Sequence, residues 1–67
     1  MHFVYVLTSL KDDYKYVGMT KDLSKRLEEH NSGISKSTKA HLPYKIIYYE
    51  TYENYIDAYH REKYFKT

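Results

Sequence analysis

The chain has 67 residues, which is enough for one small domain with one modest hydrophobic core. It has no cysteine, which excludes a disulfide framework and a thiolate zinc site. Eleven basic and nine acidic residues give a net charge of +2, which is too close to neutral to identify a partner. With no signal peptide and no apolar run of membrane-spanning length, we expect a single cytoplasmic domain over residues 1–67, without a membrane partner.

Two short strands open the chain. Residues 2–8 are mostly β-branched or aromatic and too few for a helix, which favours a strand. Residues 14–19 alternate in character and predict a second strand. The polar turn at residues 10–13 joins the two strands into a β-hairpin.

The register of this hairpin brings two tyrosines to one face of the sheet. If Ser9 pairs with Tyr14, Tyr5 lies opposite Gly18, and Tyr5 and Tyr16 point the same way. Gly18 has no side chain, so we expect it to leave space beside Tyr5 for something other than a side chain. Gly18 is therefore a predicted structural residue of a site.

A helix follows the hairpin. Thr20 or Asp22 can cap its start, and it runs to about Asn31. Leu23 and Leu27 are four residues apart and mark its inner face.

The second half of the chain predicts a loop, a third strand and a second helix. Gly33 is placed to end the first helix in a left-handed conformation, and residues 34–42 form a polar loop. Residues 44–52 predict a strand, and a capping pattern at Asn54 begins a helix that reaches the chain end. The order β-β-α-β-α predicts an α+β fold with a small three-stranded antiparallel sheet flanked by helices.

Three charged or polar helical residues break the amphipathic pattern. Arg26 and His30 lie four residues apart and flank the apolar face of the first helix. Glu62 falls inside the predicted inward stripe of the second helix, with no obvious positive partner facing it. That stripe consists of Tyr55, Ala58, Tyr59 and Phe65.

Each of these residues also has an ordinary structural interpretation. Arg26 can lie flat over the edge of the core with its charged end in water. His30 can act as a favourable cation at a helix C-terminus. Glu62 can pair with Lys66 at the surface, one helical turn away.

Taken together, the residue types match one kind of chemistry. An arginine offers a bidentate clamp for phosphate, and a carboxylate can hold Mg²⁺, which takes phosphate oxygens as further ligands. A tyrosine hydroxyl near a cation can act as a base. These are the components of a metal-assisted phosphodiester hydrolysis.

The order of these residues resembles the GIY-YIG endonuclease family, over nearly the whole chain. Val4-Tyr5-Val6 resembles the first signature tripeptide with only its tyrosine retained, and Tyr16-Val17-Gly18 closely matches the second. Residues 22–33 look like the catalytic helix of the family, above all in its small stand-alone bacterial members. The loop at residues 37–39 and the segment at residues 58–63 resemble the same members.

The resemblance implies roles for five residues and one metal ion, Mg²⁺ or Mn²⁺. Tyr16 matches the proposed general base, and Tyr5 the tyrosine that helps to place water and metal. Arg26 matches the arginine on the scissile phosphate, and His30 a residue that supports proton transfer or phosphate orientation. Glu62 matches the single metal-binding carboxylate. No small-molecule cofactor is implied.

Two departures from the family pattern stand out. Met19 occupies a position where some relatives carry a lysine. Stand-alone relatives commonly continue past the second helix, which leaves open that the chain lacks a short C-terminal extension.

The expected partner is DNA, cleaved with structure-directed or no sequence preference, and branched, nicked or single-stranded forms are candidates. Sequence readout needs a module that contacts base edges, and no such module is predicted. Lys25, Lys36 and Lys39 are the expected phosphate contacts, although scattered lysines are more commonly a solvated face. The main alternative is a non-catalytic nucleic-acid-binding module of the same fold, and a weaker one is a protein-interaction domain that exposes its tyrosines.

Overall fold

The computed structural model describes residues 1–34 and 36–66, so position 35 of the predicted loop and position 67 at the predicted helix end lie outside it. The predicted order β-β-α-β-α is confirmed, with one additional helical turn in the loop before the third strand. The elements are β1 (His2–Ser9), β2 (Lys15–Thr20), α1 (Leu23–Asn31), α2 (Lys36–Lys39), β3 (Tyr44–Tyr52) and α3 (Tyr55–Lys66).

The three strands form one antiparallel sheet in the order β2-β1-β3. The predicted hairpin register is confirmed, because Tyr5 pairs with Gly18 and the Ser9 amide donates to the carbonyl of Tyr14 over 2.9 Å. Successive residues of a strand face opposite sides of the sheet. Tyr5 therefore faces one side, and Val4 faces the other.

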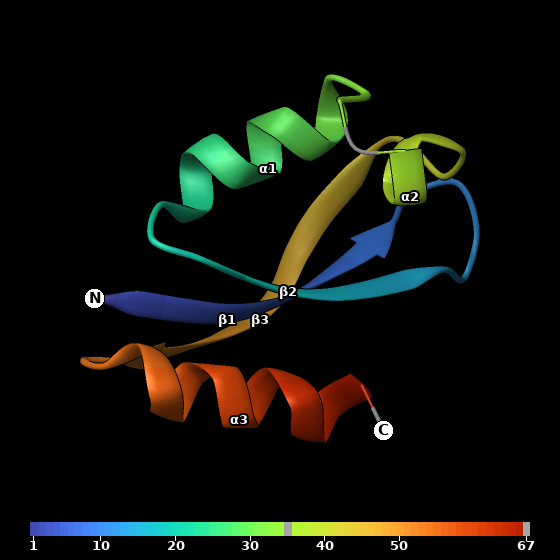
Figure 1. Ribbon diagram of the computed structural model, residues 1–67. Helices are drawn as coiled ribbons and strands as arrows, with labels where there is room; N and C mark the ends of the chain where they lie inside the picture. The colour runs from blue at the N-terminus through green and yellow to red at the C-terminus, as the bar shows by residue number, and fades with distance from the viewer. Residues whose placement is uncertain (35, 67) are drawn as a thin grey trace.

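The two longer helices cover opposite faces of the sheet, with α1 on one side and α3 on the other (Figure 1). On the α1 side, Tyr5, Leu7 and Tyr44 form a buried cluster, against which the predicted inner-face residues Leu23 and Leu27 pack. On the α3 side, Val4 and Ala58 are fully buried. The predicted α+β class with a three-stranded sheet between helices is thus confirmed.

Local capping fixes where the helices begin and end. The Asp22 side chain accepts a hydrogen bond from the Lys25 amide at 3.1 Å, so of the two predicted caps of α1 the aspartate is the one used. Gly33 follows the helix with a φ of 81°, as predicted for a left-handed terminus. The Asn54 side chain caps α3 by accepting from the Asp57 amide at 2.9 Å.

The polar loop at residues 34–42 is more ordered than its sequence predicts, because α2 lies within it. The Tyr44 hydroxyl donates to the Thr38 carbonyl at 2.7 Å. The Asn31 side chain holds both backbone groups of Tyr44, accepting from its amide at 2.7 Å and donating to its carbonyl at 3.1 Å. These bonds tie α2 to the end of α1 and the start of β3.

The inward face of α3 differs from the predicted stripe. Ala58 is buried and Phe65 half-buried as expected, but Tyr55 and Tyr59 are exposed and stack on each other with ring centroids 6.0 Å apart. The helix is fixed instead by Arg61, whose guanidinium binds both carboxylate oxygens of Glu50 on β3, at 2.8 and 3.1 Å. Of the helices within the described ranges, none combines the length and apolar character needed to cross a membrane.

Candidate active site

Tyr5 is the centre of a buried polar group beneath α1. Its ring is only 1% exposed, and its hydroxyl lies 3.0 Å from His30 Nε2 and 3.3 Å from Arg26 Nε. Burial raises the pKa of Tyr5, the hydrogen bond and charge of Arg26 act in the opposite direction, and the negative charge of Glu62 adds a smaller increase. Two side chains of α1 are therefore joined to the central strand through one phenol oxygen.

His30 is completely buried, and both of its ring nitrogens have partners. Nε2 faces the Tyr5 hydroxyl, and Nδ1 lies 2.9 Å from the Thr38 hydroxyl oxygen on α2. Burial lowers the pKa of His30, and the nearby positive charge of Arg26 lowers it further. The imidazole is consequently neutral near pH 7. Its burial argues against the alternative that it serves only as an exposed cation at the helix end.

Arg26 bridges the buried group and the surface. Its Nε donates to Tyr5, while Nη1 donates to Glu29 at 3.0 Å, and the side chain is 33% exposed. The hydrogen bonds from Arg26 to Tyr5 and then to Glu29 raise the pKa of the guanidinium, which stays charged at every working pH. Arg26 also lines an open hollow of about 380 Å³ with Met19, Thr20, Lys21, Asp22, Lys25 and Glu29.

Tyr16 lies beside this group without a hydrogen bond to it. Its ring centroid is 5.0 Å from that of His30 and 6.4 Å from that of Tyr5, so the predicted shared face of the two tyrosines is confirmed. Within residues 1–34 and 36–66, the Tyr16 hydroxyl makes no hydrogen bond. This half-buried hydroxyl can therefore contact water or a bound ligand.

The expectation that Gly18 leaves space for something other than a side chain is wrong. A Cβ at Gly18 would lie 2.6 Å from Cζ of Tyr5 and 2.8 Å from Cε2 of Tyr16. The space is filled by the two tyrosine rings themselves. The glycine is required because the Tyr5 ring lies across the backbone of β2 to reach α1.

Glu62 comes from α3, on the other face of the sheet from α1 (Figure 1). Its carboxylate is 18% exposed and pairs with Lys66 at 3.2 Å, so the expectation that it has no positive partner is wrong. The Lys66 ammonium lies 5.4 Å from the centre of the Tyr16 ring. In the described part of the chain, Glu62 forms no hydrogen bond with Tyr5, Tyr16, Arg26 or His30, and its partner Lys66 lies over the Tyr16 ring.

The acidic and imidazole side chains are dispersed in the molecule. Across the residues that the structure describes, no three histidine, aspartate or glutamate side chains gather closely enough to bind a metal ion together. Any metal held by Glu62 would thus take its remaining ligands from water and from a bound phosphate, as Mg²⁺ commonly does.

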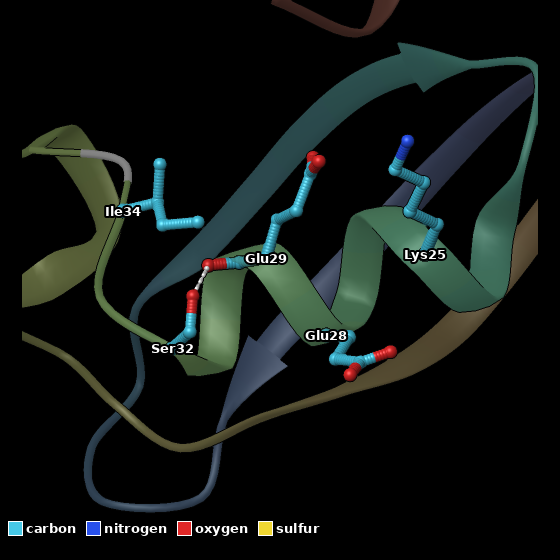
Figure 2. A pocket seen from close by; sticks show the side chains of 5 residues that line it. All are labelled: Lys25, Glu28, Glu29, Ser32 and Ile34. Carbon is cyan, nitrogen blue, oxygen red and sulfur yellow. Dashed lines mark hydrogen bonds between the residues drawn. The ribbon is translucent and has the colours of Figure 1, made fainter.

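The three lysines expected to contact phosphate lie on two elements. Lys36 and Lys39 are exposed on α2, and Lys25 is exposed on α1. Lys25 and Glu29 project from the same side of α1 and Glu28 from the other, around a second hollow of about 370 Å³ (Figure 2). That hollow is also lined by Ser32 and Ile34. Lys25 is thus shared between the hollow at Arg26 and the second one.

Two contacts of the site were not anticipated from the sequence. Thr38 lies in a loop without periodicity, where nothing distinguishes an inward hydroxyl from its exposed neighbours. The Arg26–Glu29 pair, at a spacing of three residues, does have a signal, because opposite charges at this spacing on a helix meet.

Comparison with known proteins identifies the family. The family model of the GIY-YIG catalytic domain matches residues 1–67. A UPF0213 protein of Clostridium perfringens is 42% identical over 67 residues, covering 98% of this chain and 71% of the relative. A UPF0213 protein of Bacillus licheniformis is 42% identical over 66 residues, covering 97% and 67%, and one of Staphylococcus aureus is 40% identical over 67 residues, covering 98% and 80%. No solved structure gives a significant match. The chain therefore belongs to the GIY-YIG family of nucleases, and it resembles the small UPF0213 members along nearly its whole length.

Proposed function

We propose that this protein is an endonuclease that hydrolyses DNA phosphodiester bonds with the help of a divalent cation, Mg²⁺ or Mn²⁺. The observation that carries the proposal is the bond of 3.3 Å from Arg26 to Tyr5, which holds a permanently charged guanidinium at the edge of an open hollow. Membership of a nuclease family supports the same chemistry. We further propose that residues 1–67 act as a single domain.

Arg26 is proposed to bind the scissile phosphate. Its Nε is fixed by Tyr5, and Nη1 and Nη2 lie on the outer part of the guanidinium fork, which suits paired bonds to phosphate oxygens. A donor oriented in advance stabilises the charge that builds on the phosphate in the transition state. Glu29, which pairs with Nη1, must yield this position to the phosphate.

Tyr16 is proposed to accept the proton of the attacking water as a phenolate, after its own hydroxyl proton has passed to solvent. Its hydroxyl makes no bond to the described residues, so it can bind a water molecule. Tyr5 and His30 are too deeply buried to touch the substrate, and we propose that they hold Arg26 in place. This assigns Tyr5 a positioning role, whereas family resemblance implies the placement of water and metal.

The proposed metal ligand is Glu62. A single carboxylate fits Mg²⁺, which takes one or two protein carboxylates and otherwise binds water and phosphate oxygens. When bound, the ion would polarise the phosphate and lower the cost of its developing charge. Glu62 would exchange its bond with Lys66 for this ion, and the 47% exposure of the Lys66 side chain allows that lysine to turn away.

The proposed substrate is DNA read through its backbone, with structure-directed or no sequence preference. The exposed cations Lys25, Lys36 and Lys39 can contact phosphates, and such contacts release counterions. A helical turn as short as α2 offers no element that reads base edges in a groove. Binding should therefore weaken steeply as salt rises.

The test is a cleavage assay with Mg²⁺, Mn²⁺ or chelator on duplex, flap, junction, nicked and single-stranded DNA. We expect metal-dependent cleavage of at least one form. Arg26→Lys should lower the rate on the order of 10²–10³-fold, because a point charge does not reproduce the fork. Arg61→Lys is the control for loss of a guanidinium fork, since this arginine pairs with Glu50 and does not line the hollow. Because Arg61 also holds α3, its rate is compared at a temperature where thermal unfolding shows the variant to be folded. Salt-sensitive binding of DNA without cleavage under any condition would instead identify a non-catalytic binding module.

A further inference from the structure

Thr38 is a buried hydroxyl for which the proposed function has no use so far. It lies on α2 and is completely buried, whereas Lys36 and Lys39 of the same turn are exposed. Its Oγ1 is 2.9 Å from Nδ1 of His30. The one-turn helix therefore presents two cations to solvent and the Thr38 hydroxyl to the buried histidine.

The direction of the proton in each bond of this group follows from Arg26. A guanidinium only donates, so the Tyr5 oxygen accepts from Arg26 Nε. The proton of the Tyr5 hydroxyl then needs an acceptor of its own. In the described part of the chain, its only other partner is His30 Nε2, which must therefore be the unprotonated nitrogen.

The same argument extends to the other side of the ring. The lowered pKa of His30 keeps the imidazole neutral near pH 7, so it carries one proton. With Nε2 accepting from Tyr5, that proton is on Nδ1, and Nδ1 donates to Oγ1 of Thr38. All three bonds thus run in one direction, from Arg26 through Tyr5 and His30 to Thr38.

We propose that Thr38 is a positioning residue of the active site, whose hydroxyl accepts the Nδ1–H of His30, stabilises this tautomer and thereby helps to hold Arg26 against Tyr5. The tautomer follows from the hydrogen bonds and from the neutral state of the buried ring. The consequence for catalysis rests on the proposed role of Arg26 as the phosphate ligand.

The opposite tautomer shows why this hydroxyl matters. With the proton on Nε2, His30 would donate to the Tyr5 oxygen and compete with Arg26 for its lone pairs. The Tyr5 proton would lose its acceptor and turn towards the Arg26 Nε–H, setting one donor against another. A buried donor without an acceptor is unfavourable, so Arg26 would leave this position.

The backbone of Thr38 is held in place by bonds that do not involve its hydroxyl. Its carbonyl accepts from the buried Tyr44 hydroxyl at 2.7 Å, and Asn31 binds the Tyr44 backbone on both sides. The backbone that carries the hydroxyl is thus anchored independently of His30. A phosphate that binds Lys36 or Lys39 would contact the same helical turn that carries Thr38.

The first experiment measures the tautomer of His30 directly, by long-range ¹H–¹⁵N correlation spectra of the imidazole in the protein without DNA. We expect a protonated Nδ1 and an unprotonated Nε2 in the wild type and in Thr38→Ser. In Thr38→Val, which keeps the shape but removes the hydroxyl, the proton should move to Nε2. A wild-type spectrum with the proton on Nε2 would overturn the proposal, even if Thr38→Val does not fold.

The second experiment compares cleavage by the same three proteins. Thr38→Val should lower kcat by about 10- to 100-fold with little change in KM, by analogy with the loss of a hydrogen-bond partner that orients a metal-bound histidine. Thr38→Ser should restore the rate. If the tautomer shifts in Thr38→Val while kcat is unchanged, the link from Thr38 to Arg26 is wrong. If the wild type cleaves no DNA at all, the proposed function fails, and the spectra still decide the tautomer.

Discussion

Arg26 is paired with Glu29, its neighbour one turn along α1, and the two side chains are equally exposed at 33%. A carboxylate thus occupies the outer side of the guanidinium where a phosphate would bind. Glu29 therefore places a negative charge where the proposed phosphate would bind. This pairing makes the first prediction specific to one side chain.

Glu29→Gln should tighten DNA binding by roughly two- to fivefold, because an exposed ion pair is worth up to about 1 kcal/mol and its loss frees Arg26. Fluorescence anisotropy with labelled DNA at several salt concentrations measures the change. Glu28→Gln is the matched control, since Glu28 projects from the other side of α1 (Figure 2). Equal effects of both substitutions would mean that net charge, and not the Arg26 pair, controls binding.

Glu62→Gln should leave the free energy of unfolding in chelator within about 1 kcal/mol of the wild type, because its partner Lys66 is half-exposed and such pairs contribute little. Cleavage at limiting Mg²⁺ should fall, and excess Mn²⁺ should restore part of it. Thermal unfolding and rates across a metal titration measure the two effects.

Glu53→Gln is the control for this carboxylate, since Glu53 is exposed between β3 and α3. It should keep the wild-type metal dependence. Wild-type cleavage by Glu62→Gln at limiting metal would show that Glu62 is not the ligand, and the surface-pair interpretation would then hold.

The buried His30 should make the protein less stable in mild acid. Its folded pKa lies below the ordinary value of 6.5, so between these two values the unfolded chain binds the proton more readily. The free energy of unfolding does not depend on His30 above about pH 6.5. It declines as the pH falls from 6.5 towards the folded pKa of His30, by at most about 1.4 kcal/mol per pH unit for one proton. Urea unfolding at a series of pH values measures the slope.

His30→Gln should flatten this pH dependence, while His60→Gln, on the exposed side of α3, should keep it. Glu50, whose bonds to Arg61, Tyr48 and Tyr52 lower its pKa from 4.5 to about 2, adds its own loss of stability only as the pH falls below about 4.5, so the His30 slope is read above that pH. A dependence that survives in His30→Gln would assign it to another histidine.

Gly18→Ala should cost about 1–3 kcal/mol by overpacking and should also reduce cleavage, because the new methyl group displaces both site tyrosines. Gly33→Ala offers a comparison of similar cost. Its φ of 81° makes alanine unfavourable by about 1–2 kcal/mol, but its nearest neighbours, Leu42 and Lys39, lie at 3.8 Å, so the new methyl group displaces neither site tyrosine. Equal losses of activity in the two variants would mean that stability alone explains them.

Sequence patterns over a few neighbouring residues were sufficient to predict much of the fold. The turn length between Ser9 and Tyr14 fixed the hairpin register, and the alternation of strand residues then brought Tyr5 and Tyr16 to one face. The cap at Asp22 and the left-handed Gly33 are equally local. Such features depend on residues a few positions apart, where spacing alone carries the information.

The features that the sequence did not predict depend on contacts between residues far apart in the chain. The inward face of α3 is set by a close approach at Ala58 and by the Arg61 bond to Glu50, eleven positions away, so Tyr55 and Tyr59 turn outwards. The sequence predicted open space beside Gly18, and it did not show that the rings of Tyr5 and Tyr16 fill that space. The burial of Thr38 similarly follows from the position of His30, eight residues earlier, and from no pattern in its own loop.

The central position of β1 has a consequence for how the protein reaches its folded state. This strand precedes both of its partners, and its pairing with β3 joins residues about forty positions apart, such as Tyr5 and Tyr49. Closing so long a loop costs entropy before any contact compensates for it, which slows folding relative to helical proteins of this size. The hairpin of β1 and β2 can form early, but one edge of β1 stays unpaired until β3 arrives. During synthesis on the ribosome, that edge of β1 stays unpaired until residues 44–52 have emerged.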